Sequence, residues 1–287
     1  MNLSVLLLLF VTLVWGTTFP IIRAASAHLS GVEITALRFL VAGICMLPFV
    51  LKASRAAWRD GIALGTIALL SYVGQAVGLE YISANRSAFL TSLNVLMVPF
   101  LMLFAGGRLR LQIVSAAVLA CVGIGLMSWE GGANLIGDGA TIACAFAYAV
   151  YVILLSRRIQ AHSSRTLAAT QIVAMAIISL VWLVIADVSG KTLGTLPARV
   201  MPVWPSLLYL GVVASAGMLF LQAVGQRRVS AERAAVIYAM EPVFAALFGW
   251  LWLGETLGMR GLTGGALVVL AVILGEWRFA PRAVARQ

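Results

Sequence analysis

Long apolar stretches separated by short polar connections run along most of the chain. Each stretch is about long enough to cross the ~30 Å hydrocarbon core of a membrane as a helix. A β-barrel would instead show segments of about ten residues that alternate in polarity. The pattern therefore predicts an all-α integral membrane protein with ten transmembrane helices. They cover residues 3–22, 33–51, 61–81, 87–105, 112–129, 137–155, 167–186, 205–225, 234–253 and 261–277.

The composition indicates that lipid surrounds most of this chain. Hydrophobic residues make up 62% of the 287 positions and charged residues 10%, whereas soluble proteins have about 45–50% and about 25%. The connections are too short to hold a soluble domain. We expect the longest of them, residues 187–204, to be a loop with little regular structure, because it carries Gly, Thr and Pro.

The first apolar stretch has an alternative interpretation as a signal peptide. The small residues Ala24-Ala25-Ser26-Ala27 follow it, as at a cleavage site. However, no basic residue precedes the stretch, and it is long for a signal sequence. We therefore expect it to be retained as the first transmembrane helix.

The basic residues are unevenly distributed among the connections. With the N-terminus in the cytoplasm, the inner connections hold 14 of the 20 Lys and Arg residues and the outer connections hold 5. Basic loops tend to stay in the cytoplasm, so we expect both termini on that side. This bias accounts for the net charge of +10. The basic residues lie on separate loops without a groove of stacking aromatic residues, which indicates no nucleic-acid partner.

The chain also contains a weak internal repeat. Gln75-Ala76-Val77-Gly78 reappears as Gln222-Ala223-Val224-Gly225, and Ser83-Ala84-Asn85-Arg86 reappears as Ser230-Ala231-Glu232-Arg233, both at an offset of 147 residues. At this offset Asn94 falls on Glu241. We therefore expect two homologous domains, residues 1–134 and 135–287.

Each predicted domain has five helices, an odd number, so the two domains must have opposite topologies in the membrane. Inverted repeats of this kind place a binding site near the midplane, at the pseudo-two-fold axis. They also allow inward-open and outward-open states to form when the two halves exchange conformations. The repeat thus predicts a transporter that works by alternating access.

Several short motifs resemble the drug/metabolite transporter superfamily, in particular its EamA-type ten-helix members. The motifs are Trp15-Gly16-Thr17-Thr18-Phe19, Arg38-Phe39-Leu40, and Glu241-Pro242 followed by Leu253-Gly254-Glu255. The chain looks most like the bacterial exporters of the YddG kind, which implies export of aromatic and other neutral amino acids across a bacterial cytoplasmic membrane. It departs from the pattern in one place, because Arg108 stands where the second half has Glu255.

Glu241 is the sharpest candidate site residue. It lies near the middle of the ninth predicted helix, beside Pro242. An ionised, unpaired carboxylate there costs several kcal/mol, so it should be neutral, paired or open to a wet cavity. It could bind substrate or couple a proton, or it could be a structural group bonded to a neighbouring helix. Its repeat partner Asn94 is a second candidate, and Pro99 and Pro242 are candidate gating residues.

Arg38 lies about a turn and a half inside the outer end of the second predicted helix. It could pair with a substrate carboxylate or with Glu241. Alternatively, it could extend to the membrane surface or pair with Glu33, and we favour this structural interpretation.

Amide and aromatic side chains supply the other candidates. Gln75 and Gln222 could hydrogen-bond to a zwitterion or tie helix to helix. Several aromatic residues could line a pocket for a bulky side chain, or simply pack between helices. The further candidates for substrate binding are Trp15, Thr17, Tyr72, Tyr148 and Tyr238, and Tyr81 is a candidate gating residue.

The remaining patterns concern packing and excluded chemistry. Gly74-x-x-x-Gly78 and Gly261-x-x-x-Gly265 predict close approaches between helices. No His, Cys or carboxylate spacing suits a metal, and no phosphate-binding loop is present, so we expect neither a cofactor nor an enzyme.

Three function classes remain open at this point. They are an exporter of amino acids or similar zwitterions, an exporter of cationic drugs or other metabolites, and a membrane enzyme or scaffold. The repeat and the lack of a catalytic constellation argue against the third class. We favour the first, with amino acids as substrates, the lipid bilayer as the other partner, and a monomer as the functional unit.

Overall fold

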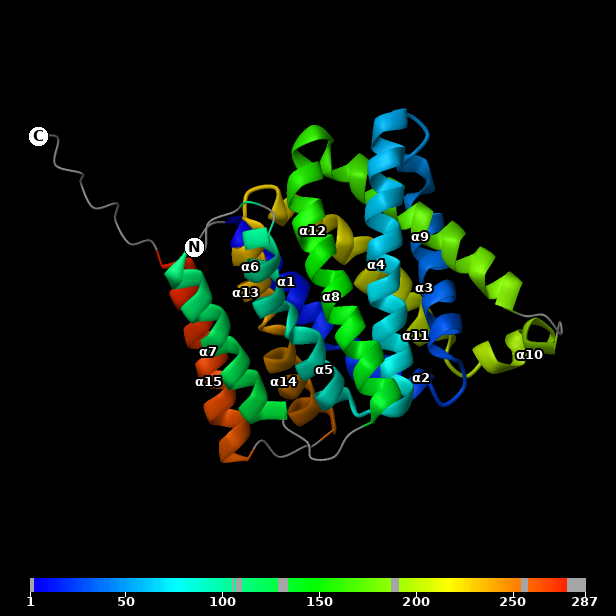
Figure 1. Cartoon of the computed structure of the whole chain (residues 1–287). Coiled ribbons are helices and arrows are strands. Elements are labelled where there is room, and N and C mark those ends of the chain that lie inside the picture. The colour runs from blue at the N-terminus through cyan, green and yellow to red at the C-terminus, as the bar shows by residue number, and fades with distance from the viewer. Residues whose placement is uncertain are drawn as a thin grey trace, which may run out of the picture.

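Every described element of the chain is a helix (Figure 1). The computed structural model describes residues 3–104, 106, 110–128, 134–186, 191–253 and 258–277. Arg108 and Glu255, which occupy the same place in the two halves, lie outside them. The elements are α1 (Leu3–Gly16), α2 (Thr18–Ala25), α3 (Gly31–Met46), η1 (Leu47–Phe49), α4 (Arg55–Tyr81), α5 (Ala84–Ser92), α6 (Asn94–Phe104), α7 (Leu111–Ser128), α8 (Leu135–Arg158), η2 (Ile159–Ala161), α9 (Ser164–Ala186), α10 (Lys191–Val200), α11 (Trp204–Leu208), the π-helix η3 (Tyr209–Gly217), α12 (Met218–Gln226), α13 (Ala231–Tyr238), α14 (Glu241–Leu253) and α15 (Met259–Glu276).

Eight helical segments in the described part are long and apolar enough to cross a membrane. The prediction of an all-helical membrane protein is therefore confirmed. A shorter apolar helix covers Leu111–Met127, and the ninth predicted stretch is divided between α13 and α14. The eight segments are Leu3–Ala25, Gly31–Phe49, Arg55–Tyr81, Ala84–Phe104, Leu135–Ala161, Ser164–Ile185, Trp204–Gln226 and Met259–Glu276.

Polar residues in the connections start several of these helices. The side chains of Ser30, Ser54, Ser83 and Asn134 each accept a hydrogen bond from a backbone N–H in the first turn of the following helix. Such caps satisfy N–H groups that have no partner within the helix. The helix ends are thus encoded locally, while the apolar interiors supply the packing.

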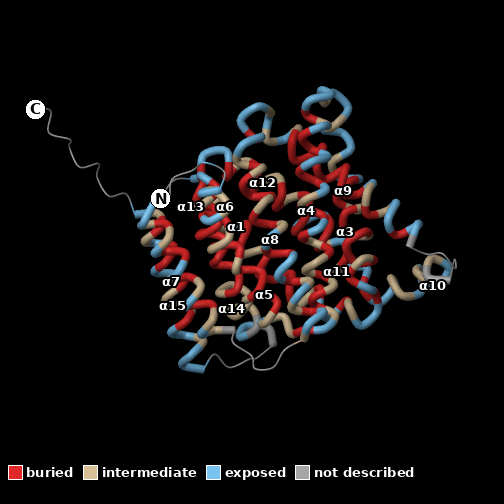
Figure 2. Tube along the Cα trace, in the orientation of Figure 1, coloured by how far each residue is buried: buried red, intermediate tan, exposed pale blue. Residues whose placement is uncertain are grey.

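Buried residues gather in the middle of the bundle, and the outward-facing helix surfaces are exposed and apolar (Figure 2). Leu70, Phe146, Ile177 and Leu270 are large side chains in helix interiors, and each is more than half exposed. A soluble protein rarely exposes so much continuous apolar surface. This surface is suited to lipid.

Three spans are interrupted rather than continuous. Thr17 separates α1 from α2, Leu93 separates α5 from α6, and residues 239–240 separate α13 from α14. Asn94 and Glu241, which the repeat aligns, are each the first residue of the helix that follows a break. The local structure thus repeats together with the sequence, at the same offset.

The longest predicted connection contains a helix, so the prediction of a loop with little regular structure at residues 187–204 is wrong. α10 occupies Lys191–Val200 in spite of Pro197. Leu196 and Val200 pack against the core, and the Arg199 guanidinium donates to the Glu33 carboxylate at 2.7 and 2.5 Å. This bond raises the pKa of Arg199. These tertiary contacts stabilise a helix that Gly and Pro disfavour locally.

An ion pair and a hydrogen bond to a carboxylate also join helices at the end predicted to face outward. The Arg86 guanidinium at the start of α5 donates to both oxygens of Asp138 on α8, at 2.6 and 2.7 Å. The Gly31 N–H at the start of α3 donates to the Glu80 carboxylate on α4. The Arg86 pair connects the two predicted halves at this end of the bundle.

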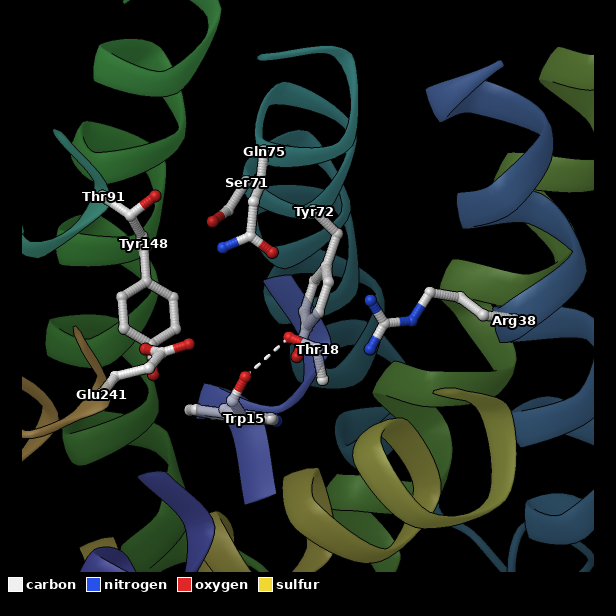
Figure 3. A pocket seen from close by; sticks show the side chains of 9 residues that line it. All are labelled: Trp15, Thr18, Arg38, Ser71, Tyr72, Gln75, Thr91, Tyr148 and Glu241. Atoms are coloured by element: carbon white, nitrogen blue, oxygen red, sulfur yellow. Dashed lines mark hydrogen bonds between the residues drawn. The ribbon is translucent and has the colours of Figure 1, made fainter. Parts of the chain in front are cut away.

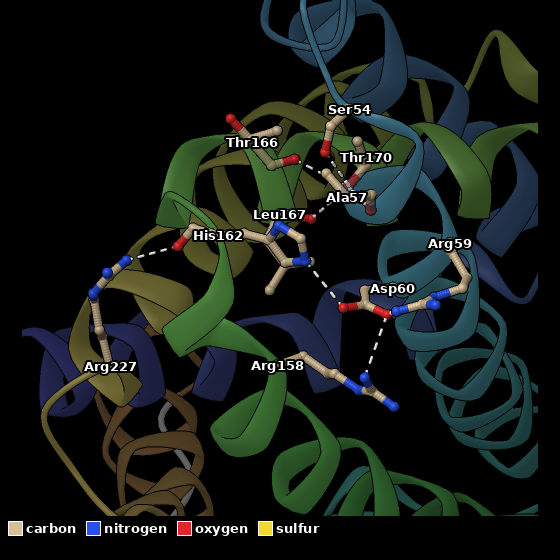
Figure 4. A network of polar contacts seen from close by, with 10 residues as sticks. All are labelled: Ser54, Ala57, Arg59, Asp60, Arg158, His162, Thr166, Leu167, Thr170 and Arg227. Atoms are coloured by element: carbon tan, nitrogen blue, oxygen red, sulfur yellow. Dashed lines mark hydrogen bonds and ion pairs between the residues drawn. The ribbon is translucent and has the colours of Figure 1, made fainter.

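At the opposite end, a buried carboxylate joins α4 to the connection between α8 and α9 (Figure 4). Asp60 Oδ2 lies 3.0 Å from His162 Nε2, and Asp60 Oδ1 lies 3.6 Å from an Arg158 nitrogen. The Arg227 guanidinium, in the turn after α12, donates to the His162 carbonyl at 2.8 Å. The network links the ends of several spans on this side.

Small residues allow the closest helix contacts, as predicted for α4. A Cβ on Gly74 would lie 2.8 Å from the Ala140 carbonyl oxygen of α8, and one on Gly78 would lie 2.1 Å from Thr141 Oγ1. In α15 the closest contact falls on Gly264, where a Cβ would lie 2.4 Å from the Gly123 carbonyl oxygen of α7. The second predicted motif contains Gly265 instead, and a Cβ on Gly265 would have no neighbour nearer than 3.8 Å. The residue that faces α7 is therefore one position earlier than the motif predicts.

We expect Gly74→Val to lower the thermal unfolding temperature of the purified protein. The added side chain meets backbone, which cannot move aside without separating α4 from α8. The matched control is Gly139→Ala on α8, where a Cβ has nothing within 4 Å. Equal unfolding temperatures for the two variants would contradict the described α4–α8 packing.

Candidate functional site

A cavity lies in the centre of the bundle, where six spans meet (Figure 3). The space between its atoms amounts to about 390 Å³, part of which is open to solvent. Its wall combines aromatic rings with hydroxyl, amide and charged groups, a composition typical of small-molecule sites. The lining residues are Trp15, Thr18, Arg38, Ser71, Tyr72, Gln75, Thr91, Tyr148 and Glu241.

Aromatic rings form one side of the cavity. Trp15 and Tyr148 meet edge to face, with ring centroids 6.1 Å apart and an interplanar angle of 77°. Tyr238 packs behind them, 6.0 Å from Trp15 and 5.8 Å from Tyr148. The Trp15 indole N–H donates to the Ala214 carbonyl at 2.9 Å. Aromatic clusters of this geometry are rigid and favour contact with a flat apolar group.

Glu241 faces the cavity from the break between α13 and α14. It is 8% exposed, and no described residue forms a salt bridge with it. As the first residue of α14, it lies at a helix N-terminus, where the helix dipole favours negative charge. The break therefore places at the cavity an acidic group that no described residue holds in a salt bridge.

Arg38 faces the same cavity from the other side, on α3 (Figure 3). It is 2% exposed, its Nε donates to Ser215 Oγ at 2.9 Å, and its guanidinium lies 4.8 Å from the centre of the Tyr72 ring. The favoured interpretation, that Arg38 reaches the membrane surface or pairs with Glu33, is wrong. Glu33 is bound by Arg199 instead. Arg38 points inward, where it packs against Tyr72 and bonds to Ser215.

Gln222 and Tyr238 lie behind the cavity wall rather than in it. The Gln222 amide donates to the Tyr148 hydroxyl at 3.0 Å and accepts from the Tyr151 hydroxyl at 3.2 Å. The Tyr238 hydroxyl donates to Gln226 Oε1 at 3.2 Å. These bonds hold the aromatic side of the cavity in place, whereas Gln75 lines the cavity directly.

The other predicted site residues have different surroundings. The Thr17 hydroxyl donates to the Val14 carbonyl and lies 2.6 Å from the Tyr209 hydroxyl. Asn94 Nδ2 donates to the Thr91 carbonyl at 2.7 Å, beside the cavity but outside its lining. Tyr81 is exposed at the end of α4. Of the two prolines, Pro99 lies within α6, and Pro242 is the second residue of α14.

Three residues that line the cavity were not predicted from the sequence to bind substrate: Thr18, Ser71 and Thr91. Short hydroxyl residues are common in membrane helices, because they bond to the helix's own carbonyl groups. Thr18 does so, donating to the Trp15 carbonyl at 2.8 Å. The only available signal was the position of Thr18 within the Trp15–Phe19 motif.

A second, larger hollow opens at the end predicted to face the cytoplasm. It has about 1910 Å³ of empty space and lies between α6, α8, α12 and α13, close to Pro99 and Ser156. Its basic lining residues are Arg110, Arg157, Arg227, Arg228 and Arg233, and Glu232 is its acidic lining residue.

A bundle of membrane-length helices, interrupted around a polar central cavity, defines the class of this protein as a membrane transporter. The sequence profile of the EamA-like transporter family matches residues 2–129 and again residues 135–275. The chain belongs to this family, and is not an enzyme.

Related proteins agree with this assignment. The chain is 31% identical over 274 residues to an uncharacterized transporter of Archaeoglobus fulgidus, covering 94% of this chain and 85% of the relative. It is 24% identical to the uncharacterized transporter YvbV of Bacillus subtilis, covering 94% and 90%. A protein of known crystal structure has the same fold, with a TM-score of 0.75 at 18% identity over 96% of this chain and 98% of the other.

We expect Tyr148→Phe to destabilise the purified protein by about 1–3 kcal/mol, because the buried Gln222 amide loses its acceptor. Thermal unfolding in detergent measures this effect. Tyr72→Phe is the matched control, since the Tyr72 hydroxyl bonds to no other described residue and its loss should change little. A larger loss of stability in the control would contradict the role given to the Tyr148–Gln222 bond.

Proposed function

We propose that this transporter exports aromatic and other neutral amino acids by alternating access. The observation that carries the proposal is the composition of the central cavity. Aromatic rings line one side of the cavity. Arg38 and Glu241 face the cavity from opposite sides. A zwitterion with a bulky apolar side chain matches all three features: its carboxylate suits the arginine, its ammonium suits the glutamate, and its side chain suits the rings.

We further propose ten spans in two inverted halves, residues 1–134 and 135–287. The short helix α7 and the broken pair α13–α14 would complete the eight longer spans. The matching breaks before Asn94 and Glu241 support this arrangement, since equivalent residues of the two halves then flank one axis. Both termini would face the cytoplasm of a bacterial cell, and one monomer would form the whole transport path.

The interrupted helices give alternating access a physical basis. A helix break removes backbone hydrogen bonds, so the adjoining half-helices can tilt separately around a fixed site. Pro99 and Pro242 lie within six residues after the breaks at Leu93 and residues 239–240. Opening of the outer end would require the Arg86–Asp138 pair to separate.

Export of cationic drugs is the second candidate. Glu241, an acidic group in an aromatic cavity, favours it, because aromatic rings and a carboxylate together attract organic cations. The Arg38 guanidinium in the same cavity opposes it, since like charges repel at short range. Competition between the two substrate classes distinguishes them.

The function is tested by uptake of labelled phenylalanine into liposomes that hold only this protein. We expect saturable uptake that unlabelled neutral amino acids inhibit and organic cations do not. An imposed pH gradient, applied in parallel, shows whether a proton moves with the substrate. Uptake no greater than in empty liposomes would contradict the amino-acid proposal and leave the transporter family unaffected.

We expect Glu241→Gln to abolish the response of uptake to a pH gradient, if this carboxyl carries the coupled proton. The amide keeps the shape of the side chain and cannot gain or lose a proton at these pH values. The measurement is phenylalanine uptake with and without the gradient, and Glu232→Gln, in the cytoplasmic hollow, is the control. An unchanged gradient response together with normal uptake would restrict Glu241 to a structural role.

The orientation is tested by thiol labelling in a background without Cys45, Cys121 and Cys144. We expect Ser156→Cys, in the larger hollow, to react with an impermeant reagent in inside-out vesicles. Tyr81→Cys, at the other end of the bundle, should react in intact cells instead. The reversed pattern would place the termini outside.

A further inference from the structure

Arg38 is a buried cation whose partners in the protein are incomplete. Its Nε donates to Ser215 Oγ, and its guanidinium lies against the rings of Tyr72 and Phe39, at 4.8 and 5.6 Å. Its Nη2 is buried and has no hydrogen-bond partner in the described part of the chain. One donor of a fully buried guanidinium is therefore left unsatisfied.

The arginine also lacks a counter-charge. None of the described carboxylates forms a salt bridge with it, and Glu33, on the same helix, is already bound to Arg199. A buried, uncompensated cation costs several kcal/mol. Such a group persists where an anion completes it during function.

The fold holds Arg38 in this position by a specific device. Ser215 belongs to the π-helix η3, and its hydroxyl donates to the Leu210 carbonyl at 2.7 Å. The hydroxyl oxygen is thereby left to accept from Arg38 Nε. Gly211 allows α3 to approach η3, since a Cβ there would lie 2.5 Å from Val41 Cβ. π-Helical turns occur frequently at functional sites.

This arrangement leaves the end of the guanidinium directed at the cavity. Ser215 occupies Nε, and the Nη atoms point toward the Tyr72 ring at the cavity wall (Figure 3). A carboxylate can accept two parallel hydrogen bonds from such a guanidinium. A lone amine or an uncharged ring offers nothing to these Nη atoms.

We propose that Arg38 binds the carboxylate of the transported molecule, so that a carboxylate is the required chemical feature of the substrate. The ammonium of an amino acid then points toward Glu241, on the far side of the cavity, and its side chain toward Trp15 and Tyr148. This inference rests on the proposed function and adds to it the group that decides which molecules are accepted.

The test measures equilibrium binding of three probes to the purified protein: L-phenylalanine, 3-phenylpropionate and phenethylamine. The second lacks the ammonium and the third lacks the carboxylate. We expect Arg38→Gln to weaken binding of phenylalanine and 3-phenylpropionate about 10- to 100-fold, the loss typical of a hydrogen-bonded charge. Phenethylamine should bind the native protein weakly, and Arg38→Gln should leave its binding equal or make it stronger. Arg38→Lys should weaken the two carboxylates less than Arg38→Gln does, because it keeps the charge and loses the paired donors.

Arg23→Gln is the matched control, since Arg23 bonds to the Leu79 and Glu80 carbonyl oxygens outside the cavity. It should leave all three affinities unchanged. Thermal unfolding separates a binding role from a structural one. Removing an unpaired buried charge should leave the unfolding temperature of Arg38→Gln equal or higher, and a large decrease would contradict the proposal.

The outcomes distinguish the two proposals. If Arg38→Gln weakened the binding of all three probes equally, or of none, the role of Arg38 would be overturned. Binding of phenylalanine to the native protein would then still support the proposed function. Arg38-dependent binding of 3-phenylpropionate without binding of phenylalanine would uphold the carboxylate role and contradict amino-acid export. Failure of every probe to bind the native protein would contradict both.

Discussion

In a hydrocarbon environment every backbone N–H and C=O needs a partner within the protein, and this requirement determines where this chain can hold a binding site. Helix breaks are tolerated only where they are enclosed by protein or line a cavity. The interruptions at Thr17, Leu93 and residues 239–240 all lie next to the central cavity, whose lining draws on the helices that they divide. The site, the repeat and the expected motion therefore share one physical origin.

The same low-polarity surroundings make it costly to leave the two charged cavity residues unpaired. Glu241 and Arg38 are 8% and 2% exposed, and none of the described residues pairs with either through a salt bridge. At both ends of the bundle, by contrast, charged groups are paired, as in Arg86–Asp138 and Arg158–Asp60. Charges at the ends of the bundle are thus paired within the protein, whereas the two charges at the cavity are available to a ligand.

The sequence predicts the eight long apolar helices well, because bilayer thickness fixes the length of an apolar helix. It also directs attention to Trp15 and Glu241, through a motif and a repeat. It fails for α10, whose Gly and Pro disfavour a helix that tertiary contacts stabilise. It fails for the direction of Arg38, which depends on a π-helix register and a Ser215 hydroxyl that no pattern along the chain reveals.

The most direct test of the transport site is a crystal structure of the protein bound to 4-iodo-L-phenylalanine, with the iodine located by anomalous scattering. We expect one strong iodine peak in the central cavity, beside Trp15 and Tyr148, with the ligand carboxylate at Arg38. A peak in the hollow lined by Arg157 and Arg228, with the central cavity empty, would contradict it.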